Sequence, residues 1–125
     1  MMSKTSIVIL SDPKSNSDEA LGRILNAFAL AYDLKQQSST VVITFQGAGT
    51  RWVSILQEPT HPAHTFFEAV KDKVLGVSCG CADVFSAGEA KTAGFEVLTE
   101  NLVPGTTGLP PLGRLLNEGY QVITF

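Results

Sequence analysis

The chain has 125 residues, close to the usual length of one domain, so we expect residues 1–125 to form a single domain without an interdomain cleft. A hydrophobic share of 44% excludes general disorder, and a charged share of only 17%, against a typical ~25%, favours a chain that buries surface in a homo-oligomer. The net charge of −3 and the scattered basic residues exclude a basic stripe for nucleic acid.

Five short apolar runs predict five β-strands. The runs are nearly continuous rather than alternating, which is typical of strands covered on both faces in a parallel sheet. In chain order they are Ser6–Leu10, Thr40–Phe45, Val74–Ser78, Phe95–Leu98 and Tyr120–Phe125.

A long helical pattern, Asn16–Gln36, follows the first strand, with Asn16 as the predicted N-cap and Glu19 completing a capping box. Its apolar residues fall into two stripes, which both need burial. We expect one stripe to cover the sheet and the other to contact another subunit. The first stripe is Leu21, Ile24, Leu25, Phe28 and Tyr32, and the second is Ala27, Leu30 and Leu34.

Shorter patterns predict a turn over Trp52–Gln57 and helices over His64–Lys73, Ala82–Ala93 and Pro110–Glu118. Phe66 and Phe67 are adjacent, so they cannot both face the sheet. The alternation of strands and helices predicts an α/β fold, a three-layer α/β/α sandwich with a five-stranded, mainly parallel sheet. Ligands bind such sheets outside the carboxyl ends of the strands. The loops expected at that edge are 11–15, 46–51, 79–81 and 99–109.

Cys79 and Cys81 follow the third predicted strand and precede a predicted helix. Unpaired N–H groups and the helix dipole favour an anion at such a position, which raises the thiolate fraction of a cysteine. Gly80 allows a tight turn between the two sulfurs. The alternative is that both cysteines are small buried hydrophobic residues, the common fate of free cysteine.

The other loops at this edge offer a second kind of site. Gly47, Gly49 and Arg51 form a glycine-rich loop whose backbone amides and guanidinium could hold a small anion. The same ligand could contact Asp12, Thr106 and Thr107, although Asp12-Pro13 is also a common turn. The loop lacks the third glycine of a dinucleotide fingerprint, so we expect no cofactor.

His61 and His64 form an H-x-x-H pair that could join Cys79 and Cys81 in a tetrahedral zinc site. The spacing matches no zinc-finger pattern, so we expect no metal. Residues 76–80 also spell the G-x-S-x-G of a serine hydrolase, but both histidines precede the serine, which is the wrong order for that fold.

Several of these features together resemble the DsrE/DsrF-like sulfur-relay family. They are the opening apolar strand with its polar loop and long Ala/Leu helix, the cysteine at the end of the middle strand, and the Pro/Gly loop before a short last helix and strand. The resemblance covers essentially the whole chain and implies a DsrEFH-like fold and assembly into trimers or hexamers. It also implies that a cysteine at this strand end, here Cys79 or Cys81, carries a persulfide and hands the sulfur to a partner. An Arg-Gly pair that often follows this cysteine in the family is missing between Ala82 and Gly88.

The first hypothesis is therefore a sulfur carrier with sulfur donor and acceptor proteins as partners. Cys81 is favoured as the attacking thiol because it is nearer the predicted helix start, and Cys79 would resolve or accept the sulfur. The alternative is a non-catalytic oligomeric module that binds a small anion at the carboxyl edge. We expect a cytoplasmic protein with no membrane partner, since no run approaches the roughly 18 apolar residues of a membrane span and no targeting segment is visible.

Overall fold

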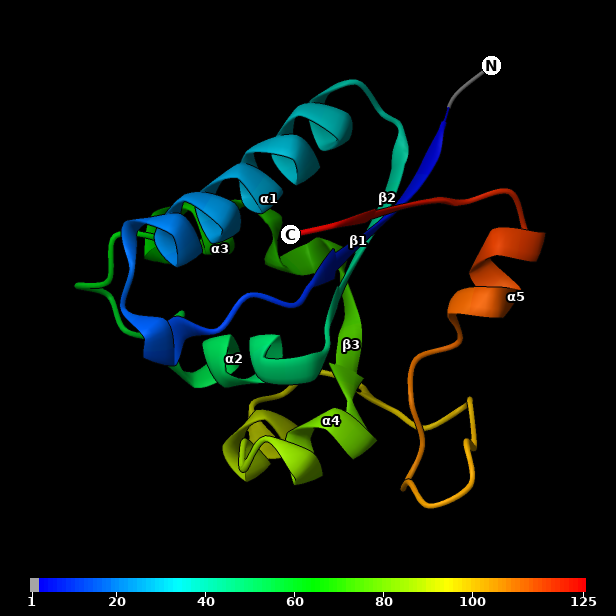
Figure 1. Cartoon of the computed structure of the whole chain (residues 1–125). Helices are drawn as coiled ribbons and strands as arrows, with labels where there is room; N and C mark the ends of the chain where they lie inside the picture. The colour runs from blue at the N-terminus through cyan, green and yellow to red at the C-terminus, as the bar shows by residue number, and fades with distance from the viewer. Residues whose placement is uncertain (1–2) are drawn as a thin grey trace.

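The computed structural model describes residues 3–125, and its strands and helices alternate along the chain (Figure 1). The strands are β1 (Lys4–Ile9), β2 (Thr40–Phe45), β3 (Val74–Ser78), β4 (Val97–Leu98) and β5 (Gln121–Thr124). The α-helices are α1 (Asp18–Gln36), α2 (Trp52–Ile55), α3 (His64–Val70), α4 (Cys79–Val84) and α5 (Leu112–Asn117). Four short 3-10 helices join them: η1 (Pro13–Ser15), η2 (Gly47–Arg51), η3 (Lys71–Lys73) and η4 (Gly88–Thr92).

The five strands form one sheet in the order β4-β3-β2-β1-β5. Every strand pair in it is parallel, which confirms the predicted α/β class and parallel sheet. The strands β1 to β4 step toward one edge of the sheet, and β5 then returns to the other side of β1. Helices α1 and α3 consequently lie on one side of the sheet and α5 on the other, giving three layers (Figure 1).

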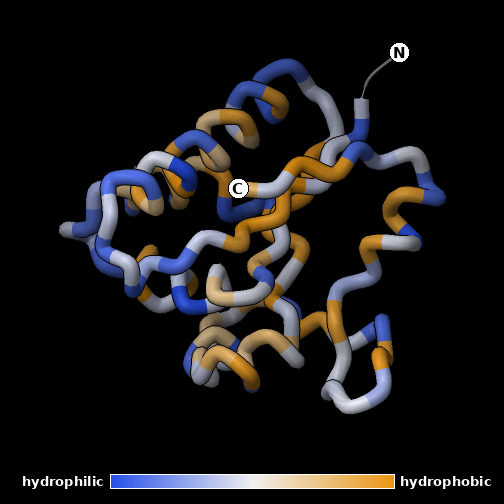
Figure 2. Tube along the Cα trace, in the orientation of Figure 1, coloured by the Kyte–Doolittle hydropathy of each residue, from blue (hydrophilic) through white to orange (hydrophobic). Residues whose placement is uncertain are grey.

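The main core lies between the sheet and helices α1 and α3. Phe67 of α3 is at its centre, with ring centroids 5.6 Å from Phe28, 6.2 Å from Phe45 and 5.9 Å from Phe95. Its neighbour Phe66 is 43% exposed, which confirms that only one of the two faces the sheet. Apolar residues dominate the central strands in Figure 2, as expected for strands buried on both faces.

The stripe of α1 that faces the core differs from the predicted one. Small side chains at Ala20, Ala27 and Ala31 are buried beside Ile24 and Phe28. They let the helix axis lie close to the sheet, so the larger Leu21, Leu25, Leu30 and Leu34 pack at its flanks, only partly buried. Tyr32, assigned to the buried stripe from the sequence, is 46% exposed.

The start of α1 also lies one residue later than predicted. Ser17 is the N-cap, and its Oγ accepts a hydrogen bond from the Ala20 N–H at 3.1 Å. Asn16, the predicted cap, instead ends η1 in a left-handed conformation with φ 49°. Asparagine tolerates that conformation better than most residues, so it serves the turn rather than the helix.

The predicted helix Ala82–Ala93 is in fact two helices, α4 and η4. Ser86 has a φ of 53°, and the Ala87 N–H donates to the Ala82 carbonyl at 2.8 Å. This is the bonding of a Schellman motif, in which a left-handed residue ends the helix. The helix also begins at Cys79 rather than near Ala82, directly after β3, which changes the positions of both cysteines.

The opposite face of the sheet is covered by α5. Leu115 of this helix is 3% exposed, and Ser6, Val8 and Thr44 on the facing strands are equally buried. The long loop between β4 and α5 therefore leaves the far edge of the sheet and crosses the carboxyl end of β3 on its way to this face. That crossing brings the loop against α4.

Candidate functional site

Cys79 is the first residue of α4 and lies at the carboxyl end of β3. Ser78, the last residue of the strand, caps the helix, since its Oγ accepts a hydrogen bond from the Cys81 N–H at 3.2 Å. Both cysteines are free and partly buried. The sequence-based preference for Cys81 depended on a helix start near Ala82, and the observed start transfers that preference to Cys79.

Cys79 has polar neighbours from two other segments. The Thr107 Oγ1 lies 3.2 Å from the Cys79 Sγ and 2.6 Å from the Asp83 Oδ2. The Lys91 ammonium, from η4, forms an ion pair with the other carboxylate oxygen of Asp83. The thiol is therefore surrounded by a hydroxyl, a carboxylate and an ammonium, which we call the Cys79 cluster (Cys79, Asp83, Lys91 and Thr107).

The charges of this cluster hold each other ionised. Hydrogen bonds, from Lys91 first and then from Thr107, lower the pKa of Asp83, so it remains a carboxylate to lower pH than usual. The hydrogen bond with Asp83 is the main cause of the raised pKa of Lys91, and the nearby Cys79 sulfur contributes to it as well. At neutral pH the cluster therefore contains one fixed anion and one fixed cation beside the sulfur.

The loop that delivers Thr107 is docked tightly on α4. The Gly80 N–H donates to the Gly108 carbonyl at 2.8 Å, and a Cβ at position 80 would lie 3.0 Å from the Leu109 Cδ2. Within the loop, Asn101 and Leu109 exchange two backbone hydrogen bonds of 2.9 and 2.8 Å. The glycine between the cysteines therefore provides the space in which the loop reaches the sulfur.

Thr106 and Thr107, predicted as ligand contacts, have different roles. Thr106 builds the turn, because its Oγ1 donates to the Val103 carbonyl at 2.7 Å and accepts from the Gly108 N–H. Thr107 belongs to the Cys79 cluster. Sequence reasoning missed Asp83 and Lys91. Asp83 follows Cys79 by one helical turn, a spacing that pairs side chains, but that signal needed the correct helix start.

The two cysteines do not face each other. Residues two apart on a helix project in directions about 200° apart, so Cys79 and Cys81 lie on different sides of the first turns of α4. A disulfide between them would require this end of the helix to unwind. The idea that one cysteine resolves the other as a disulfide is therefore unsupported by the folded geometry.

The glycine-rich loop after β2 does not form the expected anion site. The Arg51 guanidinium is 3.1 Å from the Asp12 carboxylate, 3.0 Å from the Phe85 carbonyl and stacked over the Phe85 ring. A Cβ at Gly49 would lie 2.1 Å from the Ile9 carbonyl oxygen, so this glycine is needed for close packing on β1. Gly47 takes a φ of 56° at the start of η2. These residues join loops to one another rather than lining an open site.

His61 and His64 are both used within the loop before α3. The His61 Nδ1 accepts from the Ala63 N–H at 3.0 Å, and burial lowers the pKa of His61, so its ring is neutral at pH 7. The His64 Nδ1 lies 2.8 Å from the Leu56 carbonyl. Across residues 3–125, no three His, Cys, Asp or Glu side chains gather in a way that could hold a metal ion. The zinc site considered from the sequence is not assembled.

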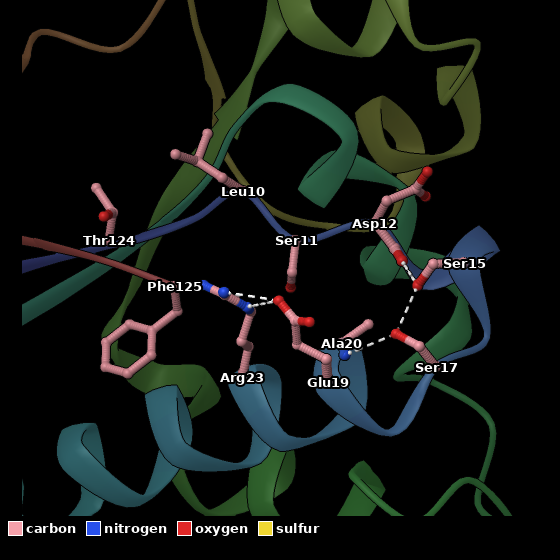
Figure 3. A pocket seen from close by; sticks show the side chains of 10 residues that line it. All are labelled: Leu10, Ser11, Asp12, Ser15, Ser17, Glu19, Ala20, Arg23, Thr124 and Phe125. Carbon is pink, nitrogen blue, oxygen red and sulfur yellow. Dashed lines mark hydrogen bonds and ion pairs between the residues drawn. The ribbon is translucent and has the colours of Figure 1, made fainter.

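A cavity of about 450 Å³ lies elsewhere on the carboxyl edge, between the end of β1, the first turns of α1 and the end of β5 (Figure 3). Its charged side chains are already paired, Arg23 with Glu19 at 2.8 Å and Asp12 with Arg51 at 3.1 Å. Two carboxylates and one guanidinium line it, which disfavours an anionic ligand. The carboxyl edge thus has two distinct features, and of these two the Cys79 cluster is the one that contains a thiol.

No known protein family, curated protein or solved structure was found to match this chain. In the described part of the chain, none of the helices has the length and apolar character needed to cross a bilayer. The functional argument therefore depends on the residues of the site.

Proposed function

We propose that this protein is a sulfur carrier of the DsrE/DsrF-like kind that holds sulfane sulfur as a persulfide on Cys79. One observation supports the proposal above the others: the Cys79 sulfur lies at the carboxyl edge of the sheet, within hydrogen-bonding distance of a hydroxyl and close to an ammonium. A hydroxyl and an ammonium can stabilise negative charge on a sulfur atom, and a cysteine packed in an apolar core has neither as a neighbour.

The chemistry requires no external oxidant. The Cys79 thiolate attacks the outer sulfur of a donor persulfide, R–S–SH, and forms a new S–S bond. The donor S–S bond breaks, its electron pair stays on the donor sulfur, and the donor leaves as a thiol after taking up a proton. Cys79 then carries the sulfur as Cys–S–S⁻, and attack by an acceptor thiolate on the outer sulfur removes it by the same exchange.

In this scheme the cysteines have unequal roles. Cys79 is the catalytic residue, and Cys81 is dispensable for loading because it lies on another side of α4. We expect protein partners as donor and acceptor, and the acceptor thiol must come from outside this chain, because the helical geometry turns Cys81 away from Cys79. Such an exchange needs a compartment that keeps thiols reduced, and the cytoplasm is our proposal.

Single-cysteine variants test the proposal. Cys79→Ser should abolish loading when the reduced protein is incubated with an excess of glutathione persulfide, whereas Cys81→Ser should load nearly as well as the wild type. Intact-mass spectrometry without reductant measures the result as a gain of about 32 Da, one sulfur atom. Loading that needs Cys81 and not Cys79, or that fails in the wild type, would contradict the assignment.

The expected homo-oligomer, a trimer or hexamer, stays a prediction. It is supported by an apolar groove of about 370 Å³ between α1 and α3, which Tyr32 and Phe66 flank with 46% and 43% of their surface exposed. Large apolar side chains gathered on one surface usually mark a contact site. We propose a second copy of this chain as the occupant.

A further inference from the structure

The Thr107 hydroxyl carries a single proton but has two acceptors within reach. Asp83 Oδ2 is 2.6 Å away and charged, whereas the Cys79 sulfur is 3.2 Å away and a weak acceptor. The proton therefore goes to Asp83. The Thr107 hydroxyl then has no proton left to donate to the Cys79 sulfur, so it does not stabilise a negative charge there.

Lys91 interacts with the same two groups, Asp83 and the Cys79 sulfur. Its ammonium is bound directly to Asp83 and is also close to the Cys79 sulfur. As long as Asp83 is ionised, its charge offsets that of Lys91 at the sulfur. The ammonium then contributes less to a thiolate than an unpaired cation would.

We propose that Asp83 restrains Cys79, because it competes with the sulfur for both groups that would stabilise a negative charge there, the Thr107 hydroxyl and the Lys91 ammonium. The inference rests on the proposed function, in which Cys79 is the sulfur-carrying residue, and it concerns the regulation of that residue. Asp83 is a positioning residue in this scheme, since it forms no hydrogen bond with the sulfur and acts through its two neighbours and through its charge.

The restraint is local to this cluster. Of the other charged groups on the elements around α4, Arg51 of η2 is paired with Asp12 and Glu100 of the long loop with Arg114 at 2.7 Å. Glu89 of η4 is exposed to solvent, which screens its charge. Strand β3 carries no ionisable side chain. Asp83 and Lys91 are thus the charged side chains that belong to the surroundings of the Cys79 sulfur.

Alkylation kinetics test the inference, with Cys81→Ser present in every variant so that only Cys79 reacts. Asp83→Asn keeps the shape of the side chain and releases the Lys91 charge, which should raise the thiolate fraction at pH 7 about fivefold. A stabilised thiolate is also a weaker nucleophile, so iodoacetamide should react about two to three times faster at pH 7. At pH 9.5, above the ordinary thiol range near 8.5, the same variant should react at about half the unmutated rate.

The crossing of the two rate profiles separates charge from exposure. If Asp83→Asn only loosened the loop over the sulfur, alkylation would accelerate by a similar factor at both pH values, and the inference would be overturned. An unchanged or slower reaction at pH 7 would overturn it too. Asp72→Asn is the matched control, because it breaks an ion pair of similar exposure, with Lys35 at 2.8 Å, that is not part of the cluster.

Lys91→Met provides the opposite perturbation. It leaves the Asp83 charge unbalanced near the sulfur, so alkylation at pH 7 should slow about two- to threefold. The double variant Asp83→Asn/Lys91→Met removes both charges and should return close to the starting rate, because the two opposite single effects offset each other. Equal slowing in Lys91→Met and in the double variant would contradict the scheme.

Failure of the inference and failure of the proposed function give different results. Alkylation reports the ionisation of Cys79 whether or not the protein carries sulfur, and persulfide loading reports the function. If persulfide loading is normal but Asp83→Asn changes the alkylation rate by a similar factor at both pH values, only the inference about Asp83 is refuted. If the alkylation rates of the two proteins cross between pH 7 and pH 9.5 but the protein never loads persulfide, the inference about Asp83 stands and the sulfur-carrier assignment is refuted.

Discussion

Replacing Gly108 by alanine should detach the loop that places Thr107 beside Cys79. Gly108 has a φ of 113°, and a Cβ there would lie 2.5 Å from both the Cα and the carbonyl oxygen of Thr99. These are backbone atoms, so no side-chain rotation relieves the overlap. Overpacking of this kind costs about 1–3 kcal/mol, in addition to about 1 kcal/mol for placing alanine at a positive φ.

The loss of stability cannot exceed the free energy of detaching the loop, because the loop can detach without unfolding the domain. Leaving breaks the Asn101–Leu109 pair of backbone hydrogen bonds, the one between Gly80 and Gly108, and the one from Thr107 to Asp83. At about 1 kcal/mol net for each of the four, detachment costs about 4 kcal/mol. The free energy of unfolding should therefore fall by about 2–4 kcal/mol, and the protein should remain folded, since domains are stable by about 5–15 kcal/mol.

Gly105→Ala is the matched control for this change. Gly105 is in the same loop with a φ of 87°, but a Cβ there meets nothing within 4 Å, so only the conformational cost of about 1 kcal/mol applies. Urea denaturation followed by the fluorescence of Trp52, the one tryptophan, measures both variants. Hydrogen exchange over residues 99–111 should rise in Gly108→Ala alone. Equal losses in the two variants would refute the steric argument.

Two further predictions concern the rest of the molecule. Arg51→Met should lower the free energy of unfolding by about 1 kcal/mol without any ligand present, because the half-exposed contacts with Asp12 and Phe85 are structural; an unchanged urea midpoint would instead leave Arg51 free for a ligand. Phe66→Asp should shift the mass measured by light scattering from an oligomer toward the monomer, whereas Thr65→Asp, on the rim of the same groove, should shift it less. A wild type that is monomeric at micromolar concentration would contradict the proposed oligomer.

The sheet could be predicted from the sequence because its strands are short apolar runs between turn residues, and periodicity carries that signal directly.

The end of α4 could not be predicted from the sequence. Its Schellman motif uses Ser86 at the left-handed position, where glycine is the usual marker, so the pattern continued into Ala87 and Lys91 without a visible break. The stripe of α1 was misassigned for a related reason. The sequence pattern assigns large apolar residues to the buried face, whereas this helix lies so close to the sheet that small alanine side chains occupy that face.

In the candidate site too, local sequence patterns predicted some positions, and contacts between distant segments determine the others. The sequence placed Cys79 at the carboxyl edge because strand and helix are neighbours in the chain. Thr107 is 28 residues away, and only the docking of its loop on Gly80 brings it to the sulfur. Lys91 depends on the break at Ser86, which directs η4 back toward α4. Contacts made by a crossing loop and by a helix end have no local sequence period.

The docking of that loop also explains the spacing of the two cysteines. Glycine at position 80 lets the loop dock closely, because a Cβ there would lie 3.0 Å from the Leu109 Cδ2 and 3.1 Å from the Gly108 carbonyl oxygen. The cysteines on either side of this glycine are turned apart by the helix. In a redox pair the two sulfurs must instead approach each other. Sulfur bound to Cys79 therefore has no acceptor within the folded chain. If Cys79 carries a persulfide, transfer requires a thiol from a partner, and the open carboxyl edge beside Thr107 is where that thiol must arrive.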